Sequence, residues 1–236
     1  MSNNKYNYPA IAIAVVVNGL LWALAVWLLL SSSAGARVGG WLFVGAKALM
    51  LLTTTIGLIC HPAQAWGIFA GRYRFDRRPL RGVGQALTRF VWELPQTGIG
   101  YLVTQWRNIF GRVKRVDCLH GIVFATGRNR QPHAYAGVST GCFVNMWLPN
   151  EIKGDFEEFA RHCPFDMYRH EFGHTIDSQR WGWFYLPLVG LMSVVSEVVE
   201  LSGHTRHRHQ DFWTERRADR LGERYFDRRE HSDGEG

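Results

Sequence analysis

Cysteine is scarce in this chain of 236 residues, and the four cysteines that it has are scattered. No two of them form a C-x-x-C pair; they are Cys60, Cys118, Cys142 and Cys163. This pattern argues against a disulfide framework, which small secreted domains build from closely spaced cysteines. We therefore expect free thiols, which is compatible with a reducing compartment.

The chain also lacks a recognised nucleic-acid-binding motif, although its formal net charge is +7. Its arginines gather at 72–81, 107–115 and 206–229, and the first group directly follows an apolar stretch. Basic residues beside a membrane segment are typical of the cytoplasmic side or of contact with anionic lipid. We therefore predict membrane lipid, and no nucleic acid, as a partner.

Two long apolar runs stand near the N-terminus. The first covers 9–30 and the second 41–60, and each matches the roughly 20 residues that cross a bilayer as a helix. Lys47 interrupts the second run, and we expect its ammonium group to snorkel to the nearer interface. The alternatives are a cleaved signal peptide for the first run and a helix buried against a soluble domain for the second.

These runs predict a membrane anchor over 1–62 with two transmembrane helices. A basic juxtamembrane helical region follows over 63–115, where aromatic residues and arginines are interleaved. Helices along the membrane surface and ordinary amphipathic core helices explain that region equally well.

The stretch His170-Glu171-Phe172-Gly173-His174 contains His-Glu-x-x-His. Residues four apart share one face of a helix, so the two imidazoles can bind one Zn²⁺ ion. Glu171 then lies beside the ion, where a carboxylate can act as general base. The helix is predicted to start at 163–166 and to stop at Gly182, with Phe165, Tyr168, Phe172 and Ile176 forming a buried stripe.

A second pair of residues follows downstream. Glu215 and Asp219 are again four apart, so one carboxylate can complete a His, His and Glu ligand set while the other orients a ligand. Glu197 is the alternative third ligand, but no acid stands four positions after it. We also consider His204 and His207 as oxyanion-stabilising donors, against a solvated basic loop.

The pattern His170-Glu171-x-x-His174 followed by Glu215-x-x-Ala218-Asp219 resembles the gluzincin metallopeptidases. Within them it is similar to the membrane-embedded CAAX prenyl proteases and stress-induced inner-membrane peptidases. The resemblance implies a zinc-dependent peptidase in the bacterial inner membrane, with its active site facing the cytoplasm and a protein or peptide as substrate. Together with the two apolar runs, it indicates an α+β, mainly helical fold with an N-terminal transmembrane hairpin and a zincin-like domain over 116–230. The polar residues 231–236 are expected to form a frayed tail.

Residues 116–126 and 134–148 are rich in Val, Phe, Tyr, Thr and Gly, which predicts a β-hairpin or a pair of strands. In zincins a strand edge near the metal helix pairs with extended substrate. By that resemblance the candidate is 140–145, which includes Gly141 and Phe143. An internal strand is an equally good interpretation.

The apolar stretch 181–201 separates the two motifs. Because His170, His174 and Glu215 are to share one ion, the chain must be on the same side of the membrane before and after this stretch. The stretch is too short for two crossings. We therefore predict an interfacial hairpin broken at Pro187 and Gly190, or a buried core helix.

Two other functions are consistent with these motifs. One is a zinc hydrolase that acts on a lipid or another small substrate, and the other is an inactive membrane scaffold with a zinc site. Glu171 argues against the scaffold, because a structural site needs no base beside its ligands.

Overall fold

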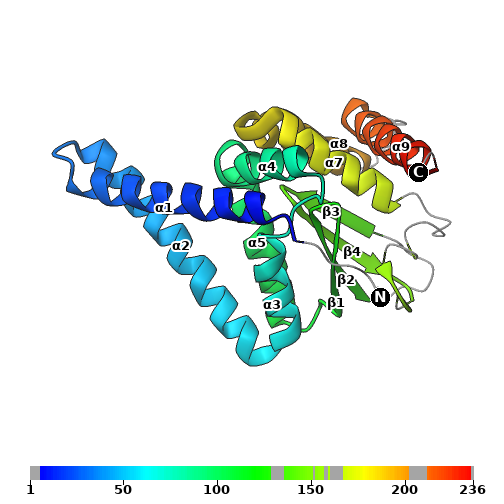
Figure 1. Cartoon of the computed structure of the whole chain (residues 1–236), viewed down its shortest axis with the longest axis horizontal. Coiled ribbons are helices and arrows are strands. Elements are labelled where there is room, and N and C mark those ends of the chain that lie inside the picture. The colour runs from blue at the N-terminus through cyan, green and yellow to red at the C-terminus, as the bar shows by residue number, and fades with distance from the viewer. Residues whose placement is uncertain are drawn as a thin grey trace.

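The computed structural model describes residues 6–128, 136–150, 152–156, 159, 167–201 and 212–234. The described chain is mainly helical and carries a small four-stranded mixed sheet (Figure 1), as the predicted α+β class requires. Its two N-terminal helices form an arm that extends away from a body containing the sheet.

The arm consists of α1 (Tyr8–Leu30) and α2 (Ala34–Cys60). Three helical segments are long and apolar enough to cross a bilayer: these two and the stretch 167–200. Within α1 and α2 most apolar side chains are exposed rather than packed against protein. Both features fit a membrane protein.

Lys47 lies near the middle of α2, because the helix begins at Ala34 and not at 41. Its Nζ donates a hydrogen bond to Asn18 Oδ1 in α1 over 2.7 Å, and it lies 5.2 Å from the ring centroid of Phe43. The prediction that this ammonium group snorkels to an interface was therefore wrong. The polar residues that interrupt the two apolar runs instead bond to each other across the hairpin.

The end of α1 nearest the body belongs to a small core. Ala10 and Ala14 are fully buried and pack in one cluster with Phe75 and Phe90. Asn7 caps the helix by accepting from the Ala10 amide, and its Nδ2 donates to the carbonyl of Asp76 over 2.8 Å. This packing favours a retained anchor over a cleaved signal peptide.

Four helical segments follow the arm: α3 (Pro62–Gly71), α4 (Pro79–Leu87), the π-helical η1 (Thr88–Trp92) and α5 (Leu94–Ile109). Helix α5 packs on the sheet, and Gly100 allows its backbone to approach the carbonyl of Thr140. Its outer face exposes Ile99, Val103 and Trp106. The inner face of α5 is therefore that of an amphipathic core helix, one of the two interpretations of the region 63–115.

Three arginines of this region are buried: Arg72, Arg89 and Arg107. Arg89 is 1 % exposed and donates to the carbonyls of Arg72 and Arg74 over 2.7 and 2.9 Å, just after α3. These bonds satisfy buried backbone carbonyls of the turn that follows α3. Arg72 lies 4.9 Å from the ring centroid of Tyr101. Arg72 therefore serves packing, and the predicted contact with lipid does not apply to it.

The sheet contains β1 (Arg115–Leu119), β2 (Ile122–Arg128), β3 (Ala136–Thr140) and β4 (Phe143–Leu148), in the order β1-β2-β4-β3. Strands β2 and β4 are parallel, and the two outer pairings are antiparallel. Each of the two segments that were predicted as single strands therefore forms a two-stranded hairpin, β1–β2 and β3–β4. Their turns fall at His120-Gly121 and at Gly141, where the backbone is left-handed with φ of +51°, +84° and +59°.

The predicted substrate strand 140–145 was wrong. Strand β4 pairs with β2 on one side and with β3 on the other, so its backbone has no free edge, and Phe143 is fully buried. Gly141 lies in the β3–β4 turn against the backbone of Thr97. The edge of the described sheet nearest the metal helix is β3.

The C-terminal part contains α7 (Met167–Trp181), η2 (Gly182–Phe184), η3 (Tyr185–Gly190), α8 (Leu191–Leu201) and α9 (Trp213–Gly234). The predicted stop at Gly182 is confirmed, and the predicted start at 163–166 lies outside the described residues. Helix α9 continues to Gly234, into the segment that we predicted to be a frayed tail.

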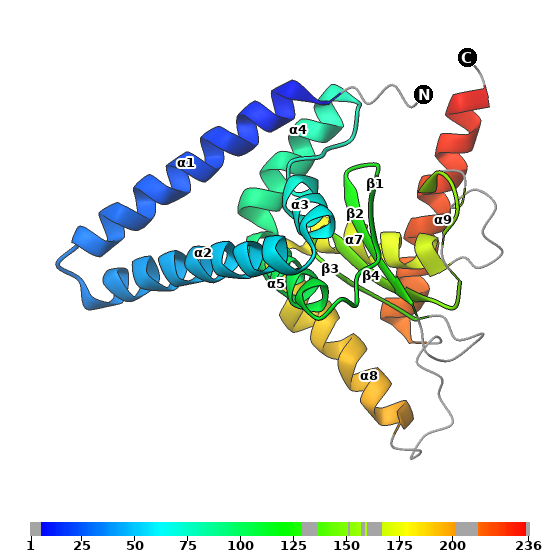
Figure 2. The ribbon, with the colours of Figure 1, turned by 90° about the horizontal axis from the view of Figure 1, so that it is seen from below.

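The predicted reversal of the chain near Pro187 and Gly190 is confirmed, whereas its placement at a membrane interface stays a prediction. The 3₁₀ turn η2 and the π turn η3 bend the chain between α7 and α8. Ser193 of α8 thereby returns to α7, because its Oγ donates to Glu215, whose carboxylate also bonds to His174. The alternative of a buried core helix was wrong, since most side chains of α8 are exposed. Figure 2 shows it projecting from the body as a separate arm.

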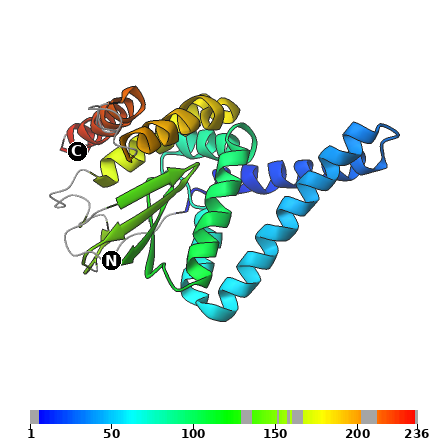
Figure 3. The ribbon, with the colours of Figure 1, turned by 180° about the vertical axis from the view of Figure 1, so that it is seen from behind.

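Helix α7 lies between the sheet and α9 (Figure 3), which buries the described part of the predicted stripe. Tyr168 and Phe172 are buried, and Ile176 is half-buried against the same core. The Phe172 ring lies 4.6 Å from that of Tyr225 in α9. Of the cysteines, Cys60, Cys118 and Cys142 are free, as predicted, and Cys163 lies outside the described residues.

Candidate metal site

The crossing of α7 and α9 brings the two motifs together. Gly173 lies against the backbone of Ala218, and a Cβ atom at position 173 would collide with the Ala218 carbonyl. Gly222 makes the equivalent approach to the carbonyl of Arg169. Two glycines, one on each helix, therefore set how closely α9 lies over the metal helix.

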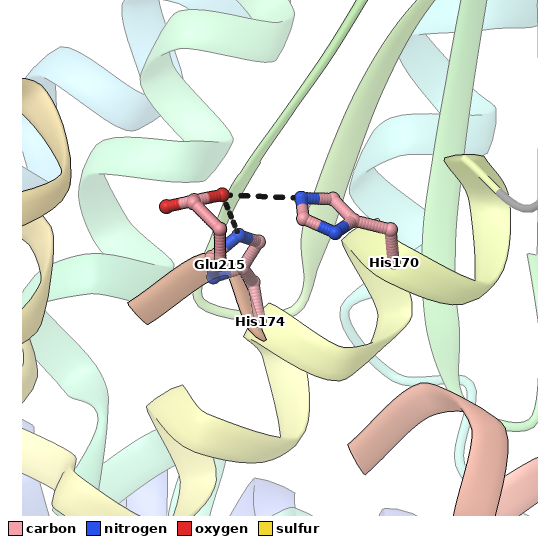
Figure 4. A group of neighbouring side chains, drawn as sticks. All are labelled: His170, His174 and Glu215. Atoms are coloured by element: carbon pink, nitrogen blue, oxygen red, sulfur yellow. Dashed lines mark hydrogen bonds and ion pairs between the residues drawn. The ribbon is translucent and has the colours of Figure 1, made fainter. Parts of the chain in front are cut away.

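The three predicted ligands converge at this crossing (Figure 4). Glu215 Oε2 lies 3.2 Å from His170 Nε2 and 3.1 Å from His174 Nε2. One ligand atom of each residue lies within 4.8 Å of those of the other two, so the group could hold a metal ion. The two imidazole rings lie edge to face relative to each other, with centroids 4.8 Å apart.

The donor set fits a divalent metal in kind and spacing. Tetrahedral bonds of about 2.0–2.1 Å place neighbouring ligand atoms about 3.3 Å apart, close to the two Nε2–Oε2 separations seen here. Two imidazoles with one carboxylate leave a fourth position open, which distinguishes a catalytic set from a closed structural one. The geometry is therefore compatible with a single ion held by His170, His174 and Glu215.

Each ligand is oriented by a further polar group. His170 Nδ1 lies 2.7 Å from Asp219 Oδ1, so Asp219 takes the position predicted for an orienting carboxylate. His174 Nδ1 lies 3.5 Å from the Tyr185 hydroxyl. The second carboxylate oxygen of Glu215, Oε1, accepts from Ser193 Oγ over 2.7 Å and from Thr214 Oγ1 over 2.9 Å. These contacts turn both Nε2 atoms and one Glu215 oxygen toward the same point.

The charges of the triad support one another. Burial alone would raise the pKa of Glu215, but hydrogen bonds from His170 and His174 hold it well below its usual range. Burial would lower the pKa of His170, but its hydrogen bonds with Glu215 and Asp219 and the nearby charges of Glu171 and Asp219 together outweigh this and raise the pKa to about 9. An anionic carboxylate between two imidazoles creates a site that attracts a cation.

Glu171 occupies a buried position beside the triad. Its side chain lies against Gly137 of β3, where the missing Cβ leaves room for the carboxylate. Its Oε2 has no hydrogen-bond partner within the described part of the chain. Burial raises the pKa of this carboxyl group, the direction that makes it a better proton acceptor.

Sequence reasoning missed several residues that complete the site. Tyr185, Ser193 and Thr214 contact ligands, but lone hydroxyl residues carry no pattern that identifies them. A partly buried ion pair joins the two helices nearby: Arg217 Nε lies 2.8 Å from Asp177 Oδ1. Asp177 lies within the metal helix, and only the crossing of α9 over α7 reveals its partner.

The remaining candidates do not join the described site. Glu197, the alternative third ligand, is exposed on α8 and is not one of the converging residues. His204 and His207 lie outside the described residues. Gly141 and Phe143 lie in and after the β3–β4 turn, as described above.

One more acid is buried close to α7. Glu93 precedes α5 and is 1 % exposed, and its Oε2 accepts from Ser178 Oγ over 2.9 Å. Ser178 follows His174 by one helical turn. Burial raises the pKa of Glu93 to about 7, although Arg89 and Ser178 both act to lower it.

This pKa predicts a pH-dependent stability. Between its ordinary pKa of 4.5 and about 7, Glu93 keeps its proton in the folded state and loses it on unfolding. The free energy of unfolding therefore falls as the pH rises through this range, by about 3 kcal/mol, and the Glu93→Gln variant lacks this fall. Unfolding in detergent at about pH 5 and about pH 8 measures it. Glu223→Gln, at an exposed position of α9, serves as the control, and equal slopes for the parent and Glu93→Gln would contradict the prediction.

Comparisons with protein-family models, with curated proteins and with solved structures find no match to this chain.

Proposed function

We propose that this protein is a membrane-anchored, zinc-dependent peptidase. The observation that carries the proposal is the convergence of His170, His174 and Glu215 from two helices, with Glu171 buried beside them. A structural metal site would need neither the open fourth position nor an adjacent carboxylate of raised pKa. The chemistry of the donors, two imidazoles and one carboxylate, favours zinc as the metal.

In this proposal His170, His174 and Glu215 hold the ion, while Asp219 fixes the ring orientation of His170. A bound Zn²⁺ would acidify a water molecule and polarise the scissile carbonyl. Glu171 accepts the proton of the attacking water and passes it to the departing amine. Its buried position keeps competing bulk water away from that carboxylate.

The free edge of β3 favours a polypeptide as substrate. Strand β3 pairs with β4 on one side only in the described sheet, and it packs against the metal helix. Its residue Gly137 touches Glu171. An extended peptide can therefore pair with β3 through backbone hydrogen bonds and place its carbonyl near the triad. A lipid would make no use of this edge.

The metal content of the purified protein tests the proposal. We expect near-stoichiometric zinc in the parent, and a loss of most of it in His174→Ala and in Glu215→Ala. Glu197→Ala, which removes the rejected ligand on α8, should keep the parent's zinc content. Elemental analysis of detergent-purified protein gives the measurement. A parent without zinc, or zinc that is retained in Glu215→Ala and lost in Glu197→Ala, would overturn the assignment.

A further inference from the structure

Helix α8 is amphipathic, but its apolar face points away from the protein. Residues spaced by three and four share one helix face, so Leu191, Val195 and Val198 lie together, flanked by Met192, Val194 and Val199. All six side chains are exposed, by 57 % at Leu191, 45 % at Val195 and 58 % at Val198. A soluble helix would bury such a face.

The opposite face of α8 is polar and includes the contact with the metal site. Ser193, Ser196, Glu197 and Glu200 follow one another at helical spacing on that face. Ser193 Oγ donates to Glu215 Oε1. The polar face thus meets the proposed metal ligand, and the apolar face is turned outward.

The apolar surface continues from α8 onto the body. Trp183 and Phe184, in η2, are 53 % and 57 % exposed. The Trp183 indole Nε1 donates to the carbonyl of Val91 over 3.0 Å, which places Trp183 beside η1 and its exposed Trp92. Tryptophan residues at the margin of an apolar face are typical of a membrane–water interface.

Helix α8 by itself is too short for a crossing, although the whole stretch 167–200 is long and apolar enough for one. Its 11 residues extend about 16 Å, roughly half of the hydrocarbon thickness of a bilayer. His174 before it and Glu215 after it converge on one point, so the chain returns to the side from which it came. The arm of α1 and α2 already fits a membrane-bound protein, so a bilayer is the apolar phase available to this face.

We propose that α8 lies in the plane of the bilayer, with its apolar face among the acyl chains and its polar face toward the metal site. The triad then opens at the membrane surface. On the proposed peptidase function, the substrate is a polypeptide segment that lies on the bilayer or emerges from it. Helix α8 also connects the bilayer to Glu215 through Ser193.

Lipid quenching tests the position of α8 independently of any catalysis. The full chain, in a Cys60→Ser background, carries Val195→Cys labelled with an environment-sensitive fluorophore. After reconstitution into nanodiscs, we expect brominated lipids to quench it about threefold more strongly than the same label at Glu223→Cys on α9. Equal quenching at the two positions overturns the proposal, whether water or a second copy of the chain covers the face.

Cleavage assays test the substrate class. Val195→Glu with Val198→Glu places two charges on the exposed apolar face, where they can lift α8 from the bilayer without disturbing a core. We expect cleavage of a membrane-anchored reporter peptide to fall about tenfold, and cleavage of the same peptide in soluble form to stay at the parent's rate. An equal fall for both reporters overturns the inference about the substrate. A parent that cleaves neither reporter yet shows quenched Val195→Cys refutes the peptidase function and leaves the position of α8 established.

Discussion

Glu171→Gln is expected to lower the rate of peptide-bond hydrolysis by about 10²- to 10⁴-fold, the usual contribution of a positioned general base. The amide has nearly the same shape as the carboxylate, so it can occupy the same buried position against Gly137. It cannot accept the proton of the attacking water, however. Steady-state cleavage of a reporter peptide by purified protein measures the effect.

Measuring the metal content distinguishes the loss of the general base from a loss of the folded metal site. Because Glu171 lies beside the ligands and is not one of them, Glu171→Gln should keep the zinc content and the unfolding temperature of the parent. Glu197→Gln, at an exposed position, provides the matched control and should retain full activity. If Glu171→Gln cleaves as fast as the parent, Glu171 is not the base and the mechanism proposed for the site is wrong.

Gly173→Ala is expected to remove most of the bound metal. The added methyl group would collide with the carbonyl of Ala218, so α9 must move away from α7 and carry Glu215 with it. Overpacking of this kind costs about 1–3 kcal/mol of stability. An alanine is intrinsically about 1 kcal/mol better than glycine within a helix, so a net loss would identify the helix crossing as the cause.

Gly190→Ala provides the control for this prediction. A Cβ atom at position 190 would meet only Leu186 Cδ2 at 3.6 Å and the Tyr185 carbonyl at 3.7 Å, which are ordinary contacts. Elemental analysis and thermal unfolding of the two variants, side by side, give the comparison. Full zinc content in Gly173→Ala, with an unchanged unfolding temperature, would show that the crossing distance does not control the site.

Patterns within one element predicted much of this molecule. The two apolar runs became α1 and α2, and the spacing of His170 and His174 placed both imidazoles on one face of α7. Glu215 and Asp219, four apart in α9, reach the two histidines as that spacing indicated. Such signals are readable because helical periodicity and hydrophobic length depend on residues that are close in the chain.

Contacts between distant segments could not be predicted in this way. The segment 140–145 reads equally well as an edge or as an internal strand, and only the pairing of β4 with β2 decides the matter. Similarly, the position of Lys47 in an apolar run predicted a snorkelling residue, whereas the tertiary structure brings Asn18 of the facing helix within hydrogen-bond distance of it.

The sequence by itself determined that this chain has two apolar N-terminal helices and a helix able to present two imidazoles and a carboxylate. Only the tertiary structure decided that Gly173 and Gly222 let α9 approach α7, that β3 is the free edge beside Glu171, and that α8 turns its apolar face outward. The physical reason is that periodicity reveals which side chains share a face, whereas what that face meets depends on the packing of the whole chain.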